Sequence, residues 1–128
     1  MNVPLYPTPD RIARDQTRKI SIRDIQHATC AVFKIGRRDM LSKSRMPHLV
    51  QPRHIAMFLS RKIARRPWLF IAREFKRDHS TIIHACRKVE AQIDAGSIST
   101  RDSLAAIKVE LDEGAKRRRV AEMREVRA

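Results

Sequence analysis

The residues from Arg77 to Ala85 constrain what this chain can fold into more than any other stretch. The stretch opens with five polar residues, Arg77-Asp78-His79-Ser80-Thr81. Apolar side chains then recur at helical spacing, at Ile82, Cys86, Val89 and Ile93. A helix with a polar first turn and packed later turns can place its N-terminal end in the major groove of DNA. The pattern therefore predicts a recognition helix over residues 79 to about 94.

A shorter helix is expected directly before it. Pro67 interrupts the chain, and an apolar stripe follows it at Trp68, Ile71, Ala72 and Phe75. Lys76-Arg77 then forms the turn, and Asp78 is a good N-cap for the next helix. The Asp78 carboxylate thus has a capping role open to it as well as a base contact. Two short helices joined by a tight turn form a helix-turn-helix.

The remaining pattern predicts an all-α fold, since the chain has three glycines and no alternating strand pattern. Ser21 to Asp24 is expected to be a capping box, followed by a helix that Gly36 ends. A short helix over 37–42 and a loop over 43–50 come next, because Pro47 would block a helix there. Gln51-Pro52 is the expected start of the following helix.

Towards the C-terminus, Gly96 is expected to end the recognition helix, and Ser99 to Asp102 offers a second capping box. Leu104, Ile107 and Leu111 then indicate a packed helix. The predicted organisation is a flexible arm over 1–20, a helix-turn-helix domain over 21–95, a final packed helix over 96–113 and a basic tail over 114–128. The tail may be prolonged as a frayed helix through Val120, Met123 and Val126.

The charge points to a polyanionic partner. The net charge is +14 over 128 residues, and the segment from Lys34 to Arg66 holds ten basic residues and one acid. Residues 96–128 hold eight basic and six acidic residues, so most of the charge belongs to the folded middle. Nucleic acid is the first expectation, an anionic membrane surface the second, and a solubility surface or ribosome association the alternative.

Other classes of function find little support in the sequence. Cys30 and Cys86 lie among apolar helical positions and are expected to be buried, reduced thiols in a cytoplasmic protein. The histidines and cysteines lack the spacing of a zinc site, so neither a metal nor another cofactor is expected. No nucleophile–base pair appears, and no apolar run reaches the length of a membrane span. The chain is therefore not expected to be an enzyme or a membrane protein.

Three blocks of sequence resemble the C-terminal DNA-binding domain of DnaA, the bacterial chromosomal replication initiator. They are Ile22-Arg23-Asp24-Ile25-Gln26, the segment from Leu41 to Arg53, and the segment from Arg77 to Lys88, which is close to the family signature RDHTTVLHACRK. The resemblance implies a compact Trp-repressor-like helical domain that binds a box such as TTATCCACA in double-stranded DNA. It also implies a basic-loop arginine in the adjacent minor groove.

The resemblance carries a set of contacts onto this chain. Arg45 falls where the minor-groove arginine stands, and a narrow A·T-rich groove attracts a guanidinium. The expected major-groove residues are Arg53, Arg77, Asp78, His79, Ser80, Thr81 and His84. The expected phosphate contacts are Lys43, Arg61, Lys62, Arg87 and Lys88. His84 could equally belong to a packing seam, and a metal-ligand role for His79 is the alternative to its DNA contact.

The chain also departs from the family pattern. His54 stands where glutamine is usual, Ser80 replaces the usual first threonine, and Lys76 stands where the turn often has glycine. Lys76 is therefore expected in a left-handed conformation at some cost. No phosphate-cradling G-x-x-x-x-G-K-[ST] motif occurs in the 128 residues, although DnaA carries an ATPase module.

Together these observations predict a stand-alone reader of DnaA-box-like sites that regulates replication initiation or transcription by occupying them. Such a protein would act as a monomer, without ATPase activity, and could contact other initiator or replication proteins. Two alternatives remain open at this point. One is a non-specific nucleoid-associated binder whose Lys116-Arg117-Arg118-Arg119 run supplies the affinity, and the other is a protein-interaction module that contacts an initiator.

Overall fold

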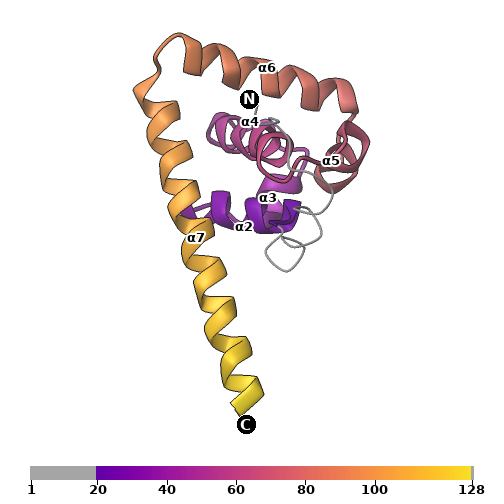
Figure 1. Cartoon of the computed structure of the whole chain (residues 1–128). Helices are drawn as coiled ribbons and strands as arrows, with labels where there is room; N and C mark the ends of the chain where they lie inside the picture. Colours follow the sequence, from indigo (N-terminus) through magenta and orange to yellow (C-terminus); the bar gives the residue numbers. More distant parts are fainter. Residues whose placement is uncertain (1–19, 128) are drawn as a thin grey trace, which may run out of the picture.

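The computed structural model describes the backbone of residues 20–127 and the side chains of residues 20–125. The predicted N-terminal arm lies outside the described residues. Within them the chain forms helices and no strand, which confirms the all-α prediction (Figure 1). The helices are α2 (Ile22–Phe33), α3 (Arg37–Leu41), α4 (Pro47–Lys62), α5 (Trp68–Phe75), α6 (His79–Asp94) and α7 (Ile98–Arg127).

Helix α4 lies at the centre of the fold. It contacts α2, α3, α5 and α6, and six consecutive residues from Ile55 to Ser60 are buried. A helix that is apolar nearly all round is expected to be enclosed by other helices. Phe75 of α5 and Ile82 of α6 are fully buried against the same core, so the helix-turn-helix is anchored on α4.

The predicted capping box at the start of α2 is confirmed. The Ser21 hydroxyl accepts from the Asp24 amide at 3.1 Å, and the Asp24 carboxylate accepts from the Ser21 amide at 2.9 Å. The predicted end of the helix at Gly36 is wrong. Lys34 takes the left-handed position, with φ 56°, and Gly36 has an ordinary φ of −79° as the N-cap of α3. The two residues after Lys34 then lead directly into the next helix.

The predicted loop over 43–50 is shorter in the structure, because α4 begins at Pro47 rather than at Gln51-Pro52. Proline suits the first turn of a helix, where its missing N–H would have no partner, so Pro47 starts α4 instead of blocking it. Pro52 lies inside the helix and is buried. The irregular stretch between α3 and α4 is therefore only residues 42–46, and we call it the basic loop after Lys43 and Arg45.

The junction between α6 and α7 combines a confirmed prediction with a correction. Gly96 follows the end of α6 with φ 79°, as the pattern predicted. The capping residue of α7 is Ser97, whose hydroxyl accepts from the Thr100 amide at 3.3 Å, and not Ser99. Serine two positions earlier already caps the helix, so Ser99 lies inside it and only accepts a bond from Ser103 through its carbonyl.

Helix α7 runs without a break through Gly114. Its first half packs on α2 through buried Ile107 and Leu111. The Arg118 guanidinium then forms an ion pair with Asp24 of α2, with 3.2 Å between the charged atoms. Beyond this point the helix extends past the other described helices (Figure 1).

Candidate nucleic-acid interface

The turn between α5 and α6 forms without glycine. Lys76 takes the left-handed conformation that the sequence predicted, with φ 54°, and its amide donates to carbonyls of the last turn of α5. Buried Ile71, Ala72 and Phe75 face the core from α5, and Ile82 and Cys86 do so from α6. The two helices also contact each other, which completes a helix-turn-helix.

The N-terminal end of α6 is open to solvent. Asp78, His79, Ser80 and Thr81 are all exposed, and no hydrogen bond or ion pair to a described residue engages their side chains. Asp78 occupies the N-cap position, yet its carboxylate makes no capping hydrogen bond. The carboxylate is therefore available as an acceptor for an external donor, such as the amino group of cytosine.

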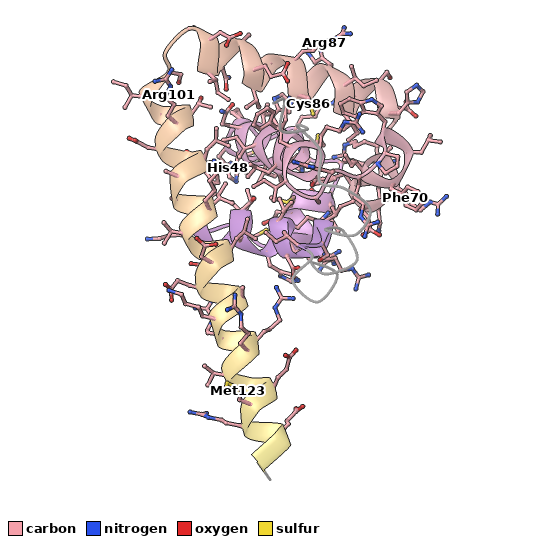
Figure 2. All side chains as sticks on the ribbon, in the orientation of Figure 1. His48, Phe70, Cys86, Arg87, Arg101 and Met123 are labelled. Atoms are coloured by element: carbon pink, nitrogen blue, oxygen red, sulfur yellow. The ribbon has the colours of Figure 1, made fainter. Side chains whose placement is uncertain are left out.

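The outer side of α6 continues this surface. His84, Arg87 and Lys88 are exposed there, whereas Cys86 is buried. Figure 2 shows Arg87 pointing away from the bundle and Cys86 pointing into it. Of the two roles that the sequence left open for His84, the packing seam is not supported, because its side chain lies at the surface.

The structure gives Arg53 a position different from the predicted one. Sequence analysis placed it at the major groove, but its side chain is only 7% exposed. The guanidinium donates to the carbonyls of Met40, Asp39, Ser42 and Ser44, and to the Ser42 hydroxyl. A guanidinium can satisfy several carbonyls at once because its five N–H groups form a fixed fork. Arg53 therefore organises the basic loop from inside.

Arg77 joins the basic loop to the helix-turn-helix. Its guanidinium donates to the Ser42 carbonyl, which also accepts from Arg53. Burial and the positive charge of Arg77 both lower the pKa of Arg53. The side chains of Lys43 and Arg45 remain exposed on the loop. Because Arg77 directly precedes Asp78, this bond places the basic loop beside the open end of α6.

The predicted phosphate contacts on α4 are occupied within the protein. The Arg61 guanidinium donates to the Arg66 carbonyl at 3.0 Å and lies 4.4 Å from the centre of the Trp68 ring. Lys62 forms an ion pair with Glu90 of α6, with 3.1 Å between nitrogen and oxygen. Both cations are drawn onto neighbouring helices, so the structure does not bring them together with the basic loop.

Sequence reasoning missed an internal scaffold beneath this surface. Gln26 of α2 is fully buried, donates to the Glu74 carbonyl of α5 and accepts from Arg37 of α3. The amide thereby ties three helices together. Nothing in the sequence distinguished Gln26 from a surface glutamine except its place beside Ile25 on the apolar face of α2.

Two exposed apolar residues were also missed. Leu69 is 71% and Phe70 52% exposed on α5, and Arg73 lies 5.8 Å from the Phe70 ring centre. The spacing of the buried residues of α5 contained this signal, because it leaves Leu69, Phe70 and Arg73 on the outer side. Figure 2 shows Phe70 pointing outward.

Both cysteines are free and buried, as expected. Burial raises the pKa of the Cys86 thiol to about 11 and also raises the pKa of Cys30. The described residues hold no group of three histidine, cysteine, aspartate or glutamate side chains that could bind a metal ion. None of the described helices is long and apolar enough to cross a membrane.

An open, polar recognition-helix N-terminus beside a basic loop defines the class of a DNA-binding helix-turn-helix domain. Residues 22–89 match the family model described as the bacterial DnaA protein helix-turn-helix, and the chain belongs to this family. The match covers the segment from α2 to α6. It concerns a DNA-binding module rather than the ATPase module of DnaA, so this region is not an enzyme.

Curated relatives support the same assignment. The chain is 39% identical over 112 residues to the chromosomal replication initiator protein DnaA of Sphingopyxis alaskensis, covering 80% of this chain and 25% of that protein. It is 35% identical over 105 residues to that of Nitrobacter hamburgensis, covering 81% and 22%. The chain thus spans about a quarter of the length of these relatives.

Proposed function

We propose that this protein binds double-stranded DNA at DnaA-box-like sites and regulates replication initiation, or transcription, by occupying them. The observation that carries the proposal is the bond from Arg77 to the Ser42 carbonyl. It holds the basic loop and the open end of α6 side by side. A duplex could therefore be read in both grooves by one face of the molecule.

In this arrangement the first turn of α6 enters the major groove. His79, Ser80 and Thr81 meet base edges there, and the Asp78 carboxylate accepts from a cytosine amino group. Arg45 reaches into the adjacent minor groove, whose negative potential is enhanced where it is narrow. Lys43, Arg87 and Lys88 contact phosphates and fix the register of the protein on the duplex.

The charge distribution favours the helix-turn-helix over the C-terminal part of α7 as the DNA-binding surface. In the basic run of α7, Arg117 is paired with Glu110 and Arg118 with Asp24. The exposed basic side chains of the loop and of α6 have no such partners among the described residues. A non-specific binder that depended on the run in α7 would have half of that charge neutralised.

Binding to a box duplex and to a scrambled duplex of the same composition tests the proposal. We expect His79→Ala and Thr81→Ala each to weaken binding to the box by about 1–3 kcal/mol, with little change on the scrambled duplex. Lys108→Ala, an exposed change on α7, should leave both affinities unchanged. Equal affinity of the unmodified protein for the two duplexes would refute sequence-specific reading.

A further inference from the structure

His54 stands out at the crossing of α4 and α6. Its Nδ1 atom is buried and has no hydrogen-bond partner, and it is the one such side-chain atom among the described residues. Buried polar groups are nearly always paired, so an unpaired one in a native protein calls for a partner that the protein alone does not supply. The atom lies on the central helix of the fold, directly after Arg53.

The groups that face His54 are all basic. Lys88 and His84 of α6 and Arg53 of its own helix lower the pKa of the imidazole, and burial lowers it most. No carboxylate is among the groups that shift this pKa. His84 and Lys88 are exposed and one helical turn apart, so they form the open side of the cluster.

These features share one complement. An anion with several acceptor oxygens could accept hydrogen bonds from the ring and balance the charges of Lys88 and His84. The cluster lies on α6 two turns beyond the open N-terminus, on the helix proposed to lie against DNA. The nearest such anion is then the phosphate backbone of the bound duplex.

We propose that His54, His84 and Lys88 form a phosphate site on which DNA binding is coupled to uptake of a proton by His54. This inference rests on the proposed function, since the phosphate belongs to the bound duplex. In the free protein the basic neighbours keep the imidazole neutral. A phosphate beside it reverses the local charge and favours the imidazolium, whose two N–H groups can donate.

The sign of the pH dependence follows. The pKa of His54 in the free protein lies below the ordinary value of about 6.5, and in the complex it is higher. Between these two values binding takes up a proton, so the duplex is bound more tightly as the pH falls. A rise of one pKa unit on binding corresponds to about tenfold tighter binding at low pH.

Calorimetry at pH 6, in two buffers with different ionisation enthalpies, measures the protons taken up when the duplex is bound. His54→Gln keeps a hydrogen-bonding side chain and removes the titrating group. We expect it to lower the uptake by about half a proton or more. The matched control, His27→Gln, removes an exposed histidine on α2 and should leave the uptake unchanged. Thermal unfolding of each variant shows that it is folded.

The outcomes separate this site from the proposed function. Phosphates are common to all duplexes, so His54→Gln should lower the uptake equally with the box and the scrambled sequence. Box binding by the unmodified protein with equal uptake in His54→Gln overturns the phosphate site alone. A loss confined to the box would assign His54 to a base edge and overturn it too. No binding to either duplex overturns the proposed function together with the site.

Discussion

Replacing Arg53 by methionine tests whether its buried guanidinium holds the basic loop in place. Four carbonyls and one hydroxyl of residues 39–44 accept from it, and the side chain is nearly inaccessible. Each hydrogen bond to a charged group contributes about 1.5–3 kcal/mol. The full sum is not expected, because Asp39 is exposed and Ser42 and Ser44 are half-buried, so their carbonyls can turn to water.

We therefore expect Arg53→Met to lower the free energy of unfolding by about 2–4 kcal/mol, the range of a broken buried network. This corresponds to a fall in Tm of about 10–20 °C for a domain of this size. Urea denaturation gives the free energy directly. Binding to the box duplex, measured well below the lowered Tm, should also weaken, because Lys43 and Arg45 lose their fixed position.

Arg61→Met is the matched control. Arg61 is another guanidinium on α4, but it donates to a single carbonyl and otherwise lies over Trp68. Its loss should cost about 1 kcal/mol and leave the basic loop unchanged. A cost below about 1 kcal/mol for Arg53→Met, or an equal cost for the two variants, would refute the assignment of Arg53 as the organiser of the loop.

Three further predictions follow from the structure. Ser21→Ala removes the hydroxyl of the capping box of α2 and should lower the free energy of unfolding by about 1 kcal/mol in urea titrations; an unchanged midpoint would contradict the cap. The Cys86 thiol, with its pKa raised to about 11, should resist alkylation at pH 8 until the protein unfolds; mass spectrometry of native and urea-treated samples shows this, and rapid native labelling would contradict the burial. Arg87→Gln should lower the slope of log K against log salt by about 1, whereas Lys62→Gln should lower it less because Lys62 is paired with Glu90; equal slopes would contradict this division of the cations.

The helix-turn-helix could be predicted from the sequence because its signals are local. The spacing of Ile71, Phe75, Ile82 and Val89 and the polar start of α6 determine which sides of the two helices are buried. Even the left-handed Lys76 was predictable, since the turn is short and lacks glycine. The capping box at Ser21 is likewise a contact between residues three positions apart.

The remaining features depend on contacts between distant segments, which composition and periodicity do not reveal. Arg53 looks like a surface arginine next to a proline, and only the fold brings the carbonyls of residues 39–44 around it. The same is true of Lys62 and Glu90, which are far apart in the chain. Gly36 misled because a glycine is the usual end of a helix, while the left-handed residue of α2 is Lys34.

The central claim is that the face formed by the basic loop and the start of α6 reads a specific DNA sequence. Selection of bound duplexes from a random pool tests this claim most directly. The account predicts enrichment of a motif similar to TTATCCACA by the unmodified protein, with the motif weakened at particular positions for His79→Ala and Arg45→Ala. A pool that stays random after several rounds, despite measurable binding, would contradict it.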